Sequence, residues 1–287
     1  MISPADISAT ADRLMAILRS MNRVVVAFSG GVDSAVVAKA AALALGDSAV
    51  AITADSPSVP RHEIAEAVAL AAMIGIRHEC VTTSEFESEN YRRNDGSRCY
   101  HCKDSLYSEI EAWIGDRVGT VICSGANLDD RGDYRPGLTA AAEHRVRHPL
   151  QEAGCDKATV RLLAKHWSLP VWDKPASPCL SSRLAPGLTV TPERTARVEA
   201  AEQILRNLGL RECRVRYHEG DLARIEVPME RIATLAEPAI RIGLLAQFQA
   251  IGFRFVTLDL EGFRSGSMNG LIALEVKQRY ADPTESR

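Results

Sequence analysis

The most constraining feature of this chain is an apolar stretch, Val24–Phe28, that runs directly into the sequence Ser-Gly-Gly-Val-Asp-Ser at residues 29–34. The apolar residues predict a buried strand, and the alanine- and valine-rich residues after the loop predict a helix. Glycine lets a backbone approach a ligand closely, and the first N–H groups of a helix, together with its dipole, attract negative charge. The strand, loop and helix therefore predict a phosphate-binding site.

The spacing of this loop differs from that of the Walker loop and of the dinucleotide-binding loop. It resembles the pyrophosphatase loop (PP-loop) of the N-type ATP pyrophosphatases, which cleave ATP between the α and β phosphates and leave AMP on a substrate oxygen. The resemblance implies a pyrophosphate grip formed by Ser29, Gly30, Gly31 and Ser34. It also implies that Asp33 lies near a Mg²⁺ ion. The plain alternative is an ordinary glycine turn with a capping serine or aspartate.

Short apolar runs alternate with helical patterns through the first half of the chain. Strands are expected at 24–28, 49–53, 79–83 and 118–124, and helices at 4–20, 34–45, 61–74 and 101–114. This alternation predicts an α/β fold with a doubly wound parallel sheet, Rossmann-like in class. Ligands of such folds bind at the carboxyl ends of the strands, where this chain places polar loops. The nucleotide-binding residues expected in the second and third of these loops are Asp55, Gly125 and Asn127.

The second half predicts a smaller α+β domain. A helix at 156–167 is followed by four prolines, between residues 170 and 186, that exclude regular helix and indicate a long loop. Then come a helix at 191–208 with Thr191 as its cap, strands at 213–218, 222–227 and 254–260, and helices within 228–250. The expected domains are a PP-loop domain over 1–185 and an α+β substrate and sulfur-transfer domain over 186–280, with a frayed tail at 281–287.

Composition limits where the protein acts and what it binds. The N-terminus has no apolar signal core and no long uncharged apolar run follows, so we expect no membrane association and a cytoplasmic location. The net charge of −3 gives no general signal for binding nucleic acid. In a reducing compartment the seven cysteines are expected to be thiols, metal ligands or catalytic groups rather than disulfides.

Three cysteines have informative neighbours. Cys179 lies in a proline-rich loop between Lys174 and Arg183, and a nearby cation lowers the pKa of a thiol and makes it more nucleophilic. Cys99 and Cys102 form a Cys-x-x-Cys pair at the start of a predicted helix, an arrangement that suits a metal, a cluster or a redox pair. An inert buried thiol is the ordinary alternative for Cys179.

A series of motifs narrows the interpretation. In order they are SGGVDS, TADSPSVPRHE, RCYHCK, SGANLDDRGDYRPG, HPLQEAGCDKATVRLLA, WDKPASPCLSSR and RVRYHEGDLARIE. From about residue 20 to 265 the chain resembles the LarE family, the ATP-dependent sulfur transferases of nickel-pincer-nucleotide biosynthesis. The resemblance implies that ATP adenylates a carboxylate of pyridinium-3,5-biscarboxylic acid mononucleotide, and that sulfur then displaces AMP to give a thiocarboxylate.

The resemblance also implies two possible sources of the sulfur. In one version of the family the cysteine matched by Cys179 gives up its own sulfur and becomes dehydroalanine. In another, three cysteines hold a [4Fe-4S] cluster whose fourth iron binds a sulfide. Because Cys99, Cys102 and Cys179 are all present, we expect the cluster version, with zinc as a lesser alternative.

Further residues are assigned by the same resemblance. Basic residues expected to face phosphates of substrate or AMP, or to lie beside the reactive loop, are Lys103, Arg183, Arg214, Arg216 and Arg264. Arg214 and Arg216 alternate along a predicted strand and so share a face, as a phosphate clamp requires. Glu202 and Glu226 match acidic positions near the transfer site, where they could position a metal or accept a proton. Solvated surface charges are the alternative for all of these side chains.

Other functions remain open at this point. A tRNA-thiolating enzyme shares the loop and often the three cysteines, an NAD-synthetase-like enzyme shares the loop alone, and an ATP-sensing module would perform no chemistry. The expected partners are a small nucleotide substrate, further copies of the chain in a homo-oligomer and transfer partners in the nickel-pincer pathway, with neither nucleic acid nor membrane among them.

Overall fold

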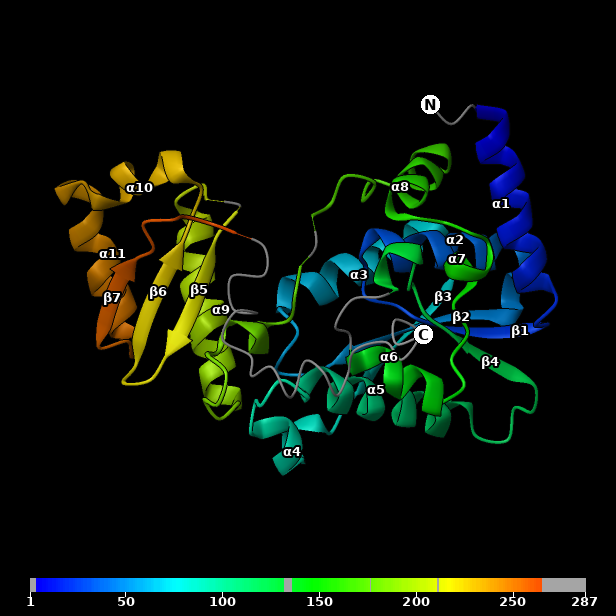
Figure 1. Ribbon diagram of the computed structural model, residues 1–287, viewed down its shortest axis with the longest axis horizontal. Coiled ribbons are helices and arrows are strands. Elements are labelled where there is room, and N and C mark those ends of the chain that lie inside the picture. The colour runs from blue at the N-terminus through cyan, green and yellow to red at the C-terminus, as the bar shows by residue number, and fades with distance from the viewer. Residues whose placement is uncertain (1–3, 132–135, 176, 211, 265–287) are drawn as a thin grey trace, which may run out of the picture. The chain divides into compact units, whose positions relative to one another are not determined.

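The computed structural model describes residues 4–131, 136–175, 177–210 and 212–264. Its contacts divide the chain into two compact units (Figure 1). Unit 1 draws its described residues from Met1–Glu85 and Cys99–Ser177, and unit 2 from Phe86–Arg98 and Pro178–Lys277. A short segment from the first half of the sequence, 86–98, therefore packs with the second half.

Unit 1 is built on a parallel sheet of four strands in the order β3-β2-β1-β4. Its strands are β1 (Arg23–Ala27), β2 (Ala49–Asp55), β3 (Arg77–Thr82) and β4 (Thr120–Cys123). Its helices are α1 (Pro4–Arg19), α2 (Val32–Leu45), α3 (Arg61–Ile74), α5 (Arg98–Ile114, whose first residue groups with unit 2), α6 (Pro136–Glu143), α7 (Pro149–Glu152) and α8 (Lys157–His166). Since all four strands are parallel, their carboxyl ends share one edge of the sheet.

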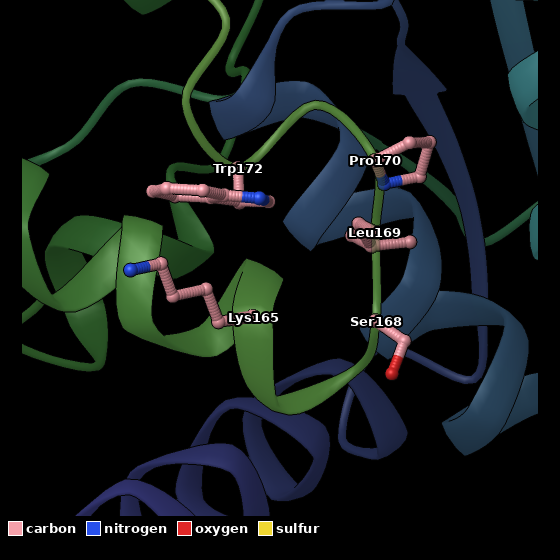
Figure 2. A pocket seen from close by; sticks show the side chains of 5 residues that line it. All are labelled: Lys165, Ser168, Leu169, Pro170 and Trp172. Carbon is pink, nitrogen blue, oxygen red and sulfur yellow. The ribbon is translucent and has the colours of Figure 1, made fainter.

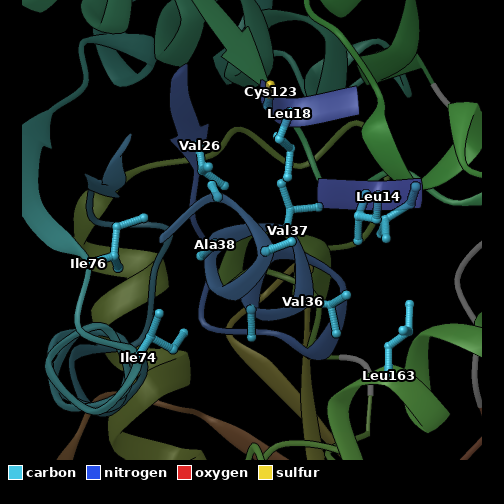
Figure 3. Close-up of a cluster of buried hydrophobic side chains, with 14 of the residues drawn as sticks. Leu14, Leu18, Val26, Val36, Val37, Ala38, Ile74, Ile76, Cys123 and Leu163 are labelled. Carbon is cyan, nitrogen blue, oxygen red and sulfur yellow. The ribbon is translucent and has the colours of Figure 1, made fainter. Parts of the chain in front are cut away.

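Side chains alternate between two cores, one on each face of this sheet. Val24 and Val26 of β1 pack with α1, α2, α3 and α8 in a cluster that includes Leu14 and Leu163 (Figure 3). Val25 points to the opposite face, into a cluster formed with α5 and α6. Each such side chain contributes about 1.5–3 kcal/mol when it is fully buried. Helices cover both faces, which confirms the doubly wound α/β class.

Unit 2 holds the smaller sheet, in the order β5-β6-β7. β5 and β6 are antiparallel and β6 and β7 are parallel. Its elements are α4 (Glu89–Arg92), α9 (Pro192–Asn207), β5 (Arg214–His218), β6 (Leu222–Glu226), α10 (Met229–Ala236), α11 (Pro238–Ala250) and β7 (Phe255–Leu258). Thr191 caps α9 by accepting a hydrogen bond from the Arg194 N–H at 3.3 Å, as expected. The α+β character of this part is likewise confirmed.

The elements differ from expectation mainly between residues 86 and 152, where α4, α6 and α7 carry no clear periodic pattern because each is eight residues or shorter. The domain limits expected at residue 185 stay a prediction, and the expected tail at 281–287 lies outside the described residues. Within the described ranges, no helix is both long and apolar enough to cross a membrane.

Candidate active site

The PP-loop connects β1 to the first turn of α2. Gly30 has φ of +69°, and a Cβ there would lie 3.1 Å from the Cβ of Ala67 on α3, so both the turn and the packing require glycine. The Ser34 hydroxyl accepts a hydrogen bond from the Ser29 N–H at 3.2 Å and donates one to the Gly31 carbonyl at 3.1 Å. The loop is therefore closed on itself and presents the start of α2, where N–H groups are available to an anion.

The loop after β4 packs directly on this helix start. A Cβ on Gly125 would lie 2.7 Å from the backbone nitrogen of Ser34 and 3.0 Å from the carbonyl carbon of Asp33. Asn127 donates a hydrogen bond from Nδ2 to Asp33 Oδ1 at 3.0 Å. The structure thus brings two of the predicted nucleotide-binding residues, Gly125 and Asn127, against the PP-loop.

Lys157 is a residue of this site that no sequence argument singled out. At the start of α8, its ammonium group lies 2.5 Å from Asp33 Oδ2, and its backbone N–H donates to the Asp129 side chain at 3.1 Å. Asp33 is therefore held between an amide and a lysine. The motif HPLQEAGCDKATVRLLA contains Lys157, but only the fold reveals that this lysine faces a residue 124 positions earlier.

Asp55 ends β2, next to β1. Its carboxylate accepts a hydrogen bond from Arg61 at 2.5 Å, and the same guanidinium donates to the carbonyls of Ser56 and Val59. The side chain is 44% exposed. Asp55 is thus positioned by Arg61, the first residue of α3, and remains accessible at the edge of the sheet where the strands have their carboxyl ends.

Cys99, Cys102 and Lys103 lie in the first two turns of α5. Cys99 is exposed and Cys102 is half-buried, and their spacing of three residues places both thiols on one side of the helix. Lys103 packs under α6, where a Cβ on Gly137 would lie 2.9 Å from the lysine Cγ. Within the described residues, no group of three or more His, Cys, Asp and Glu side chains is arranged to hold a metal ion.

Cys179 of unit 2 lies on a loop whose backbone carbonyls are held by side chains. It is half-buried and directly precedes a 3₁₀ turn, η4 (Leu180–Arg183). Arg183 donates to the Cys179 carbonyl at 2.9 Å and also contacts the Pro178 carbonyl. Arg216 donates to the Ser182 carbonyl at 3.2 Å. These contacts restrain the backbone on both sides of the thiol.

Glu202 neutralises Arg183 inside the protein. The side chains are 3% and 2% exposed, and Arg183 Nε lies 2.9 Å from Glu202 Oε1. The same oxygen accepts the Val215 N–H at 3.2 Å, and Arg206 approaches the other carboxylate oxygen at 3.8 Å. Both oxygens of Glu202 are therefore committed to protein contacts.

Glu226 neutralises Arg216 in the same way. Its carboxylate is completely buried and lies 2.8 Å from Arg216, with Arg224 at 3.1 Å on the other oxygen. Arg214 and Arg216 share a face of β5 as expected, opposite Glu226 and Arg224 in the strand register. Burial lowers the pKa of the Arg214 guanidinium, and nearby Arg183 lowers it further.

Arg264 differs from these arginines because it is exposed. It forms an ion pair with Glu261, three residues earlier, in which the side chains are 49% and 69% exposed. Such pairs contribute little to stability. Its guanidinium can therefore change partners at small cost, as phosphate binding would require.

A hollow of about 410 Å³ lies at the end of α8 (Figure 2). It is lined by Lys165, Ser168, Leu169, Pro170 and Trp172. The Lys165 ammonium lies 3.7 Å from the centre of the Trp172 ring, a cation–π contact that closes one side. The hollow contains none of the predicted site residues and its lysine is already engaged, so we assign it no role.

Comparison with known proteins identifies the family. The NAD synthase family model matches residues 12–94, which contain the PP-loop. Pyridinium-3,5-bisthiocarboxylic acid mononucleotide synthase of Lactiplantibacillus plantarum is 40% identical over 257 residues, covering 89% of this chain and 92% of that protein. The chain belongs to the LarE family.

Two further relatives match most of this chain. An uncharacterized protein of Synechocystis is 45% identical over 252 residues, covering 88% of this chain and 94% of its own. An uncharacterized protein of Methanocaldococcus jannaschii is 25% identical over 244 residues, covering 85% and 91%. The family membership confirms that the chain is an ATP-dependent enzyme of the sulfur-transferase class.

The close approach of Gly125 to α2 gives a direct test of the nucleotide site. Gly125→Ala would place a methyl group against backbone atoms that cannot move without shifting the PP-loop. We expect ATP affinity, measured by isothermal titration calorimetry, to fall about tenfold or more, which is 1.4 kcal/mol or more. Gly243→Ala is the matched control, because a Cβ there has nothing within 4 Å. Unchanged affinity in the Gly125 variant would contradict this site.

Lys157 provides a second test. Lys157→Met keeps the aliphatic stem but removes the charge beside Asp33, so we expect pyrophosphate release from ATP to slow about 10²-fold. Lys165→Met, in the same helix but at the Trp172 contact, should retain the wild-type rate. Equal rates in the two variants would show that Lys157 does not act on the phosphates.

Proposed function

We propose that the chain uses ATP to adenylate a carboxylate of pyridinium-3,5-biscarboxylic acid mononucleotide and then delivers sulfur to it by way of Cys179. The observation that carries the proposal is that one chain contains two structural features. One is a PP-loop whose aspartate is held by Asn127 and Lys157. The other is a cysteine whose loop backbone is restrained by arginines. A PP-loop alone would fit many ATP-using enzymes.

The first step makes the carboxylate reactive. A carboxylate oxygen attacks the α-phosphorus of ATP, the bond to the β-phosphate oxygen breaks, and pyrophosphate leaves. Ser29, Gly30, Gly31 and Ser34 bind the departing pyrophosphate through the loop and the first N–H groups of α2. The product is a mixed anhydride with AMP, which is a far better leaving group than hydroxide.

Mg²⁺ suits the aspartate of this loop. A carboxylate oxygen at a phosphate site is the ligand type that Mg²⁺ prefers, and the ion would neutralise charge on the phosphates. Asp33 would hold it, and Lys157 would then exchange the carboxylate for a phosphate oxygen. Asp55, Gly125 and Asn127 complete the nucleotide-binding set.

The second step uses the thiolate of Cys179. Its sulfur attacks the acyl carbon, AMP leaves, and a thioester forms. In the sacrificial route a proton is then removed from Cα and the Cβ–S bond breaks, which leaves dehydroalanine and releases the thiocarboxylate. The substrate's phosphate would bind near Arg214 and Arg264, with Lys103 as a further phosphate contact.

We favour a renewable sulfur source. Cys99, Cys102 and Cys179 would together hold a [4Fe-4S] cluster, which when bound supplies a sulfide on its fourth iron. Thiolates are the ligand type that iron–sulfur clusters take, and Cys99 is exposed while Cys102 is half-buried. Zinc in the same set, or sacrifice of Cys179, are the alternatives.

Glu202 and Glu226 receive a supporting part in this proposal. Their contacts with buried arginines favour holding the Cys179 loop and the β5 arginines in place. The metal-binding or proton-accepting roles expected from the resemblance stay predictions, as does the phosphate contact of Arg183. The resemblance further supports a homo-oligomer and transfer partners in the nickel-pincer pathway, and the seven cysteine thiols suit a reducing cytoplasm.

Cys179→Ala separates the two steps. We expect this variant to release pyrophosphate at the wild-type rate in a single turnover, since its PP-loop is intact, but to form no thiocarboxylate detectable by mass spectrometry. Cys80→Ala, which removes an exposed thiol from β3, should perform both steps. A normal thiocarboxylate yield from the Cys179 variant would exclude it as the donor.

The sulfur source is decided by iron and mass. We expect anaerobically purified protein to contain about four irons per chain and to lose them in Cys99→Ala and Cys102→Ala but not in Cys80→Ala. The intact chain should keep its mass through several turnovers when sulfide is supplied. Iron-free protein that loses the mass of one H₂S after a single turnover would instead establish the sacrificial route.

A further inference from the structure

The segment 86–98 connects two parts of unit 1 in sequence, yet it packs within unit 2. It contains the short helix α4 and a turn that ends at Arg98, the residue directly before Cys99. Phe86 and Tyr91 pack ring against ring, with centres 5.1 Å apart. The segment is therefore an ordered part of unit 2.

Asn94 is the centre of this segment. It is 2% exposed and has φ of +55°, a left-handed conformation that asparagine tolerates better than most residues. Its Nδ2 donates to the carbonyls of Ala185 at 2.9 Å and Leu188 at 3.1 Å, and its own carbonyl accepts the Gly187 N–H at 2.9 Å. One side chain thus satisfies carbonyl groups of the chain that follows η4.

Two more side chains of the segment reach the reactive loop itself. The Tyr91 hydroxyl lies 2.8 Å from the Ser181 hydroxyl, with both residues buried. Arg98 donates to the Ser181 carbonyl at 2.9 Å and also to the Asn94 side-chain oxygen. Ser181 is two residues past Cys179, so these contacts act on the backbone that carries the thiol.

Arg183 and the segment 86–98 restrain different carbonyl groups of this loop. Arg183 holds the carbonyls of Pro178 and Cys179, while segment 86–98 holds those of Ser181 and Ala185. Nucleophilic attack needs the reacting atoms about 3–3.5 Å apart and aligned, and a displacement of about 1 Å can cost 10²-fold in rate. A restrained backbone is the way to hold a small side chain such as cysteine in that geometry.

We propose that Tyr91, Asn94 and Arg98 form a clamp that positions Cys179 for sulfur transfer. The proposal rests on the role of Cys179 given above. None of the three residues touches the reacting atoms, so they are positioning residues.

Asn94→Gly tests the clamp with little backbone strain. Glycine adopts φ near +55° freely, so any effect comes from loss of the amide. We expect pyrophosphate release to stay within about twofold of wild type and the single-turnover transfer rate to fall about tenfold or more. Asn22→Gly is the matched control, since Asn22 has φ of +62°, is exposed and lies in unit 1. It should leave both rates unchanged.

Arg98 variants supply a graded series. Arg98→Met should slow transfer as Asn94→Gly does, and Arg98→Lys should recover part of the rate by donating to the Ser181 carbonyl again. Arg93→Met, at an exposed arginine that contacts Asn90, is the control. If a variant does not fold, Tyr91→Phe removes a single hydroxyl and gives a milder test. Transfer at the wild-type rate in Asn94→Gly and Arg98→Met would overturn the clamp.

A substrate-free measurement separates this proposal from the proposed function. The rate at which iodoacetamide alkylates Cys179, followed by peptide mass spectrometry, should rise about threefold or more in Asn94→Gly as the loop loosens. Wild-type protein that transfers no sulfur would refute the function, and the alkylation rates would still test the clamp. Equal alkylation rates in wild type and Asn94→Gly would overturn the clamp, even if sulfur transfer proceeds.

Discussion

The Asp33 carboxylate joins the parts of unit 1 that form the proposed nucleotide site. It lies in the first turn of α2, accepts a hydrogen bond from Asn127 after β4, and pairs with Lys157 at the start of α8. Three segments far apart in sequence thereby meet at one charged group. The Asp33 side chain is 24% exposed, so a metal ion can reach it and take the place of Lys157.

In unit 2, buried arginines join segments of the chain, as the Asp33 carboxylate does in unit 1. An arginine that donates to backbone carbonyls must be desolvated to reach them, and it is stable there only if a carboxylate compensates its charge. Glu202 compensates Arg183, and Glu226 compensates Arg216. Removing one partner of such a pair costs about 3–5 kcal/mol, because the remaining charge stays buried. The acidic residues are therefore prerequisites for the order of the Cys179 loop.

Much of the fold and of the site could be predicted from local patterns. The residues of Val24–Phe28 form a continuous apolar run, and β2 is apolar from Ala49 to Ile52. The glycines of the PP-loop can be recognised from their position between a strand and a helix. Lys157 and Asn94 could not be found in this way. Their roles arise from contacts with residues more than 90 positions away, and neither periodicity nor composition carries such information.

A second limit of prediction from the sequence concerns the acidic residues Glu202 and Glu226. The family resemblance implies that Glu202 and Glu226 lie near the transfer site, where they could position a metal or accept a proton. Their partners are arginines on neighbouring elements, and their burial leaves the carboxylate oxygens little access to a substrate. The contacts of these charged residues support the backbone that carries Cys179, whereas their metal-binding or proton-accepting roles stay predictions.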